Sequence, residues 1–149
     1  DVVATSNQAA GTVDIVFIMS DGKTPGTEMI NGLKEYLNGR TRRPMTDLVN
    51  VSAPAEVTYT VDLTYYINRS DSARAVAIQE AVQTAVADYL TWQRTIGRDI
   101  NPSKLVALVM AAGAKRVTVT APTYTTVDAI KVSALSGSPT ISYGGLEDD

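Results

Sequence analysis

The chain has 149 residues, of which 44% are hydrophobic, so it is long enough and apolar enough to bury a core without covalent cross-links. It contains no cysteine and no histidine, which excludes disulfide frameworks and thiolate chemistry and removes the commonest general base and metal ligand. The formal net charge of −3 is small and spread along the chain, which argues against a nucleic-acid-binding surface.

The first part of the sequence predicts one buried strand and one short helix. Residues 1–11 are mostly small or polar and show no apolar period, so we interpret them as a flexible lead-in. The unbroken apolar run in 13–19 is typical of a strand buried on both faces. Glycines and a proline then predict a loop, after which residues 27–38 carry apolar side chains at helical spacing.

The middle of the chain has the clearest strand pattern. Residues 48–53 predict a short strand that ends at Pro54, and residues 57–67 alternate between apolar and polar side chains. Period-two alternation indicates a strand with one buried face and one face that is wet or paired with a partner. We expect the two segments to form a hairpin across 54–56.

Residues 71–121 predict a long amphipathic helix, a tight turn, a second helix and a strand. The long helix begins near 70–71, and its apolar side chains share one stripe. The stripe consists of Ile78, Val82, Ala85, Tyr89, Trp92 and Ile96. Asn101 and Pro102 are typical of a helix start, and Gly113 is typical of a helix end.

The last part of the chain predicts strands over 115–121, 130–134 and 140–143, and a disordered acidic tail over 147–149. Together the elements predict an α+β fold with two layers, in which helices pack on one face of a mixed, largely antiparallel sheet. Their order is β-α-β-β-α-α-β-β-β, within a single domain that spans 12–146. The expected core comprises residues 13–19, Leu33, Leu37, Val61, Leu63, Ile78, Val82, Tyr89, Leu105, Leu108, Val109, Val117 and Val119.

No motif in the sequence supports an enzyme active site. Gly22-Lys23-Thr24 is similar to the end of a phosphate-binding loop, but Phe17 occupies the position of the first glycine that such a loop requires. The same loop lacks the aspartate and two serines, at alternate positions, that a metal-binding adhesion loop uses as oxygen ligands. The aspartates are dispersed, and each has an ordinary explanation in a turn, a helix cap or a strand surface. We therefore expect no catalytic, cofactor-binding or metal-binding residues.

The densest basic cluster is Arg40, Arg42 and Arg43. Its functional interpretation is recognition of a phosphate group or of an acidic protein partner. Its simpler interpretation is a solvated loop with an ion pair to Asp47. No aromatic residue is interleaved for base stacking, so we expect no nucleic-acid contact here.

The order and spacing of several markers resemble one protein family. The markers are Arg43-Pro44, Asp47, Val49, Val51, Ala53-Pro54, Tyr59, Ala81-Val82, Tyr89-Leu90, Ile96-Gly97-Arg98-Asp99-Ile100, Ser103, residues 113–119, Pro122 and Tyr143-Gly144-Gly145. Over residues 12–146 the chain resembles the C-terminal part of the baseplate J-like family, which are baseplate wedge proteins of contractile-tailed phages and related injection particles. Members of that family are longer, so we expect this chain to be a C-terminal portion that lacks an N-terminal region.

The resemblance implies a structural protein without catalytic residues or cofactors. It implies contacts with other baseplate or tail subunits and with copies of the chain itself, in a virion tail baseplate assembled in the host cytoplasm. It implies no nucleic acid, membrane or small-molecule substrate as a partner. Tyrosine suits interfaces that are partly apolar and partly wet, and arginine suits interfacial ion pairs. The candidate interface residues are Arg42, Arg43, Tyr65, Tyr66, Tyr124 and Tyr143.

Two other functions stay open at this point. One is a module that binds a small molecule or a peptide on the wet face of the 57–67 strand. The other is a carboxylate-dependent hydrolase, which requires a deep pocket with two or more convergent carboxylates. A flat surface with exposed aromatic side chains favours assembly instead.

Overall fold

The computed structural model describes residues 1–7, 11–39 and 48–148 of the chain. Within these residues it contains three α-helices, one 3₁₀ helix and eight strands, so the predicted α+β class is confirmed. In chain order the elements are β1 (Val2–Asn7), β2 (Thr12–Phe17), α1 (Thr27–Leu37), β3 (Leu48–Ser52), β4 (Ala55–Tyr59), β5 (Asp62–Asn68), the 3₁₀ helix η1 (Arg69–Arg74), α2 (Ala75–Gln93), α3 (Pro102–Ala111), β6 (Arg116–Ala121), β7 (Lys131–Leu135) and β8 (Thr140–Glu147).

The described strands form three small sheets instead of the single sheet that was predicted. These sheets have the strand orders β1-β2-β3, β4-β7 and β6-β5-β8. The pairs β2–β3, β4–β7 and β5–β8 are parallel, whereas β1–β2 and β5–β6 are antiparallel. The prediction of a largely antiparallel arrangement is therefore wrong. Parallel neighbours need a crossover connection, which often contains a helix. Helix α1 lies in the connection between the parallel strands β2 and β3.

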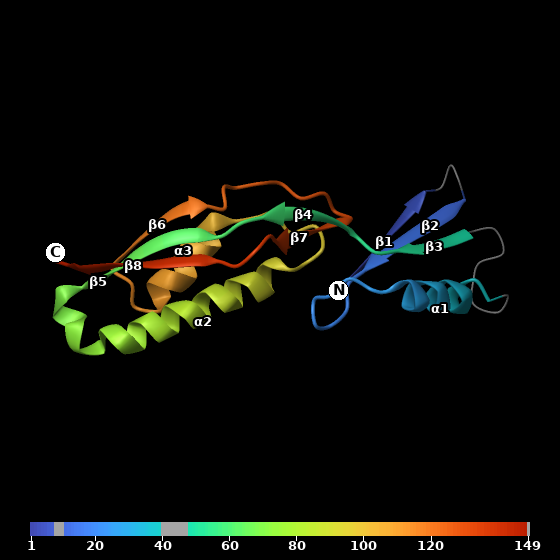
Figure 1. Cartoon of the computed structure of the whole chain (residues 1–149). Helices are drawn as coiled ribbons and strands as arrows, with labels where there is room; N and C mark the ends of the chain where they lie inside the picture. Colours follow the sequence, from blue (N-terminus) through green and yellow to red (C-terminus); the bar gives the residue numbers. More distant parts are fainter. Residues whose placement is uncertain (8–10, 40–47, 149) are drawn as a thin grey trace.

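The described residues form two units, which Figure 1 shows at opposite ends of the molecule. We call the described part of residues 1–52 the N-terminal unit; it holds β1, β2, α1 and β3. We call residues 55–148 the C-terminal unit, in which α2 and α3 lie along one side of the β6-β5-β8 sheet. Ala53 and Pro54 form the covalent connection between the two units.

The main core lies in the C-terminal unit, between β5 and helices α2 and α3. Leu63, Tyr65 and Ile67 of β5 are buried, which confirms the face that the period-two alternation predicted. The predicted stripe of α2 is also buried from Ile78 to Tyr89. The buried residues of this cluster are Tyr59, Val61, Leu63, Tyr65, Ile67, Ile78, Val82, Val86, Tyr89, Ile100, Leu105, Val109, Ala114 and Val127. Leu108, Val117 and Val119 pack against it and are partly exposed.

The N-terminal unit is packed less completely than was predicted. Helix α1 contains no fully buried residue, and both Leu33 and Leu37 are only half-buried. Within the predicted strand 13–19, Val16 and Ile18 are buried. The strand pairing places Val49 on the same face of the sheet as Val13, because the two residues lie opposite each other in the β2–β3 ladder. Helix α1 is short and covers only part of the sheet face that carries Val13 and Val49. Leu33 and Leu37 of α1 therefore stay partly accessible to solvent.

The predicted strand over 57–67 is two strands that belong to different sheets. The side chains keep their alternation through Tyr59, Val61 and Leu63, all of which are buried. The hydrogen-bonding partner changes, because the amide of Ser136 donates to the carbonyl of Tyr59 and the amide of Thr140 donates to the carbonyl of Val61. The predicted hairpin across 54–56 is also wrong, since β3 pairs with β2 and β4 pairs with β7.

Two segments that were predicted to lack structure are ordered into strands. Val2–Asn7 form β1, which pairs along its whole length with β2, although its side chains show no apolar period. Backbone hydrogen bonding rather than side-chain burial therefore defines this edge strand. At the other end, Glu147 belongs to β8 and lies opposite Asn68 of β5. The predicted acidic tail is ordered at Glu147 and Asp148, and Asp149 lies outside the described residues.

The turn between α2 and α3 ends the long helix earlier than its apolar stripe suggested. Gln93 is the last residue of α2 and is fully buried. Its side-chain amide donates to the carbonyls of Arg98 and Asp99, at 3.3 and 3.0 Å, and its carbonyl oxygen accepts from the amide of Asn101 at 3.3 Å. These bonds hold the chain in a reversed direction, so Ile96 leaves the helix and packs against the N-terminal unit.

Candidate assembly surfaces

The predicted interface tyrosines differ in their exposure. Tyr65 is 2% exposed, because it shares the buried face of β5 with Leu63 and Ile67. Its ring packs against that of Tyr143, with the ring centroids 5.6 Å apart. Tyr143 is 39% exposed and Tyr124 is 60% exposed, so each of these two presents part of its ring to solvent.

Tyr66 lies on the opposite face of β5, where its ring sits between a glycine and an arginine. The guanidinium carbon of Arg116 lies 3.9 Å from the centre of the Tyr66 ring, and the same guanidinium donates to the Glu147 carboxylate. Gly144 provides the space for the ring, because a Cβ atom there would lie 2.3 Å from Cε1 of Tyr66. The hydrogen bonds from Arg116 lower the pKa of Glu147.

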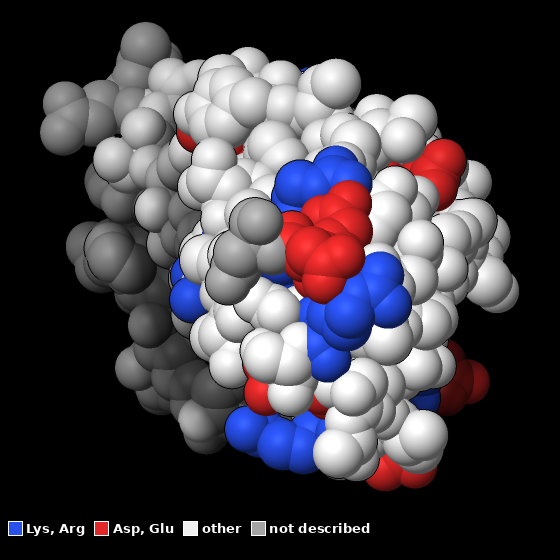
Figure 2. Space-filling view, turned by 90° about the vertical axis from the view of Figure 1, so that its left-hand side faces the viewer, with Lys and Arg blue, Asp and Glu red and all other residues white. Residues whose placement is uncertain are grey.

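The end of the C-terminal unit near η1 carries a cluster of opposite charges. Nε of Arg69 lies 2.7 Å from Oδ1 of Asp148, and the ammonium group of Lys115 donates to the carbonyl of Asp148. Figure 2 shows this end of the molecule, with acidic side chains flanked by basic ones. The charges therefore neutralise one another here, and β5, β6 and β8 are tied together at this end.

A second polar cluster anchors the segment that leads from β6 to β7. The phenolic hydroxyl of Tyr124 donates to Oδ2 of Asp99 at 2.6 Å, and the amide of Val127 donates to Oδ1 at 2.9 Å. These two bonds lower the pKa of Asp99, and the first of them raises the pKa of Tyr124. From the sequence, Asp99 was interpreted as an ordinary turn residue. The sequence did not indicate its bonds to Tyr124 and Val127, because these residues lie 25 and 28 positions further along the chain.

Two basic side chains lie close to the ring of Trp92. The guanidinium carbon of Arg98 lies 4.2 Å from the ring centre, and the ammonium nitrogen of Lys104 lies 5.6 Å from it. On its inner side the ring approaches Tyr89, with centroids 6.3 Å apart. Cation–π attraction of this kind holds the basic groups over the indole.

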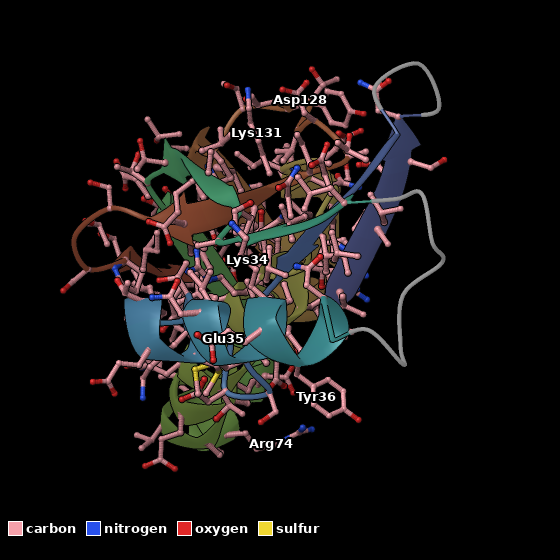
Figure 3. All side chains as sticks on the ribbon, turned by 90° about the vertical axis from the view of Figure 1, so that its right-hand side faces the viewer. Lys34, Glu35, Tyr36, Arg74, Asp128 and Lys131 are labelled. Carbon is pink, nitrogen blue, oxygen red and sulfur yellow. The ribbon has the colours of Figure 1, made fainter. Side chains whose placement is uncertain are left out.

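The N-terminal unit exposes apolar side chains of α1. Met29 is 47% exposed and Tyr36 is 56% exposed, and their spacing of seven residues places them on one side of the helix. We call this pair the α1 patch. Figure 3 looks at this end of the molecule and shows Tyr36 projecting away from the helix, near Glu35. The predicted interface residues Arg42 and Arg43 lie outside the described residues.

The junction between the two units is centred on Arg94, which follows α2. Its guanidinium donates to the carbonyl of Gly22 at 2.8 Å, to the carbonyl of Ser133 at 2.8 Å and to Oε1 of Glu56 at 2.6 Å. Beside it lies a cleft of about 770 Å³ whose lining includes Tyr59. Burial raises the pKa of Tyr59 to about 12. Sequence reasoning missed Arg94, because a lone arginine after a helix has no pattern that marks it.

The described residues hold neither a metal-binding cluster nor a membrane-spanning helix. No group of three or more histidine, cysteine, aspartate or glutamate side chains converges among them. None of their helices is both long enough and apolar enough to cross a bilayer.

Comparison with protein families finds matches to two adjoining domains. A model described as the baseplate J-like central domain matches residues 1–53, and one described as the baseplate J-like protein C-terminal domain matches residues 61–137. The interval between the two matches contains Pro54, the second residue of the connection between the units, and strand β4.

A curated relative covers most of the chain. The chain is 29% identical over 125 residues to baseplate protein J of Escherichia phage P2. The aligned residues make up 82% of this chain and 40% of the relative, so the chain spans about 40% of the length of the relative it matches.

Proposed function

Because the chain belongs to the baseplate J-like family, we propose that it is a structural component of a contractile-tail baseplate wedge. In this function it acts through contacts with other baseplate or tail subunits and with copies of itself, in the tail baseplate of a virion. It is not an enzyme in this proposal, and it requires no cofactor. The observation that carries the proposal is the pair of family matches, in central-to-C-terminal order, over two consecutive units of the chain.

The described surface supports a function in assembly. The exposed side chains of the α1 patch and of Tyr124 and Tyr143 are large and apolar or amphipathic, and such residues are enriched at protein–protein interfaces. They lie on both units, so the chain offers more than one surface to its neighbours. The basic residues Arg42 and Arg43 remain part of this proposal as partners for acidic groups.

The alternative of a strand surface that binds a small molecule or a peptide has less support than assembly. It required one continuous wet face over 57–67, and this segment is divided between β4 and β5 in two different sheets. The polar side chains of β5, including Asp62 and Thr64, are half-buried. Assembly therefore remains the better-supported function.

Co-purification from cells that assemble the tail tests the proposal. The affinity-tagged protein is expected to bring down other tail proteins, and the double substitution Met29→Ser/Tyr36→Ser is expected to reduce their yield. Loss of interface contacts worth about 1.4 kcal/mol lowers affinity about tenfold. We expect the double substitution to weaken the affinity for the tail proteins by about this factor.

The matched control is Lys34→Ser, which changes an exposed residue of the same helix. This variant is expected to retain the yield of the unsubstituted protein. If the unsubstituted protein stays monomeric and brings down no tail protein, the proposed function is wrong. If both variants retain full yield, the α1 patch is not an interface.

A further inference from the structure

The two units are joined by few contacts. One covalent connection, Ala53-Pro54, links them. One small apolar cluster spans the junction and contains Val16 and Ile18 of the N-terminal unit with Ile96 and Val132 of the C-terminal unit. Junctions of this kind, a short linker and a limited apolar contact, are where one domain rotates relative to another.

Polar contacts supplement this small cluster. Within the N-terminal unit, the backbone of Asp1 exchanges hydrogen bonds with Ile18. Across the junction, Oδ2 of Asp1 accepts from the amide of Ile96 at 2.9 Å. These bonds fix the start of β1 against the turn that follows α2. The bond across the junction uses the main-chain amide of Ile96, so it tolerates most substitutions at that position.

Arg94 makes one hydrogen bond across the junction and two hydrogen bonds within the C-terminal unit. Its three hydrogen bonds reach a loop of the N-terminal unit at Gly22, strand β7 at Ser133 and strand β4 at Glu56. The fit is close at Gly22, because a Cβ atom there would lie 3.2 Å from Cγ of Arg94. The side chain of Arg94 is 22% exposed and that of Glu56 is 42% exposed, so the ion pair is partly shielded from water. A planar guanidinium holds three acceptors in fixed directions, which a lysine does not.

The cleft beside Arg94 provides room for movement. It has a volume of about 770 Å³ and is lined on one side by Ile18 to Lys23 and on the other by residues such as Tyr59 and Leu90. Its two sides therefore belong to different units, and rotation about the connection changes its width. Arg94 crosses the cleft from α2 to Gly22 and opposes that rotation.

We propose that Arg94 is the latch of a hinge at Ala53-Pro54, and that release of its bond to Gly22 lets the N-terminal unit swing relative to the C-terminal unit. The bonds to Glu56 and Ser133 lie within the C-terminal unit and hold the guanidinium in place for Gly22. The latch rests on the geometry of this chain and is independent of the proposed baseplate function.

The absence of cysteine from the chain makes the hinge measurable by site-specific spin labelling. The substitutions Glu35→Cys on α1 and Gln83→Cys on α2 place one label on an exposed site of each unit. The distribution of distances between the two labels is measured by pulsed electron–electron double resonance. It is expected to be narrow when Arg94 is present. With Arg94→Gln it is expected to broaden or to gain a second maximum. An unchanged distribution would overturn the latch.

Two controls separate hinge motion from other effects. Arg74→Gln removes an exposed arginine whose ion pair to Asp71 lies within η1, and it is expected to leave the distribution unchanged. Hydrogen exchange identifies unfolding of the N-terminal unit. A hinge predicts that amides of the β1–β2 ladder keep their protection in Arg94→Gln, while the Ile96 amide at the junction exchanges about tenfold faster, as for a loss of about 1.4 kcal/mol. Loss of protection throughout β1 and β2 would instead show that Arg94 is needed for folding, and would overturn the proposal.

Discussion

The hydroxyl of Tyr124 lies 2.6 Å from Oδ2 of Asp99, and this bond ties the segment after β6 to the turn between α2 and α3. The same carboxylate accepts from the amide of Val127, so Asp99 fixes two points of one segment. The bonds require a charged or strongly accepting group at position 99. They give the stability of the protein a specific dependence on pH.

We expect the contribution of Asp99 to stability to be lost in acid. Its hydrogen bonds hold its pKa below the ordinary value of 3.8 in the folded protein. A carboxyl group whose folded pKa is lowered stabilises the fold above its unfolded pKa, and loses that effect as the pH falls through the folded pKa. Asp99→Asn is therefore expected to lower the melting temperature at pH 7 and to lower it less at pH 2–3. The measurement is thermal unfolding followed by circular dichroism across this range. If Asp99→Asn lowered the melting temperature equally at both pH values, this prediction would be wrong.

We expect Tyr89→Phe to leave stability unchanged or to raise it. The ring of Tyr89 is fully buried, and its hydroxyl has no hydrogen-bond partner among the described residues. Burial also raises the pKa of Tyr89, so the hydroxyl stays neutral. An unsatisfied buried polar group costs about 1–3 kcal/mol, and removing it recovers part of this amount. Denaturant unfolding measures the difference. Tyr89→Ala is the contrasting variant and is expected to cost about 3–5 kcal/mol.

We expect Gln93→Leu to be strongly destabilising. The substitution conserves approximate size but leaves the carbonyls of Arg98 and Asp99 and the amide of Asn101 without the bonds that Gln93 provides. A loss of about 2–4 kcal/mol in unfolding free energy is expected for a buried network of this kind. Gln83→Leu on the exposed face of the same helix is the matched control and is expected to change stability by less than about 0.5 kcal/mol. Equal effects of the two substitutions would contradict the assigned structural role.

We expect Gly144→Ala to displace Tyr66. The added Cβ atom would lie 2.3 Å from Cε1 of the ring, so the ring must leave its position between Gly144 and Arg116. A cost of about 1–3 kcal/mol is typical of such overpacking. Gly26→Ala is the control, because no heavy atom lies within 4 Å of the added Cβ atom. In a double-mutant cycle, Gly144→Ala is expected to cost less in the background of Tyr66→Ala, and additive effects would contradict the contact.

The sequence predicted which side chains are buried better than it predicted which strands pair. Alternation from Tyr59 to Ile67 identified the buried face, because apolar burial leaves a period in the sequence. It did not indicate that the chain changes sheets near Val61, since partner choice depends on main-chain hydrogen bonds made by distant segments. Strand β1 was missed for the same reason. Asn101 was correctly assigned as the cap of α3, and its side chain accepts from the amide of Ser103.

The surfaces were less predictable than the core. Tyrosine is a candidate interface residue in any sequence, but the sequence does not show which tyrosines are exposed. Tyr65 is buried, whereas Tyr124 is exposed. Arg94 has no neighbouring motif, and its partners at Gly22, Glu56 and Ser133 come from three separate parts of the chain. Long-range polar contacts of this kind have no local sequence signal. The family resemblance came from the order of many ordinary residues, and the family matches confirm it.

The central position of β5 affects how this chain can be completed during synthesis. Its two neighbours, β6 and β8, are both made later, and β8 reaches as far as Glu147. Until residues 140–147 leave the ribosome, β5 has an open edge, and its Leu63, Tyr65 and Ile67 belong to an unfinished sheet. Open apolar edges promote aggregation. A chain terminated before β8 is therefore expected to be removed or to aggregate, so that incomplete copies are withheld from any assembly the finished protein joins.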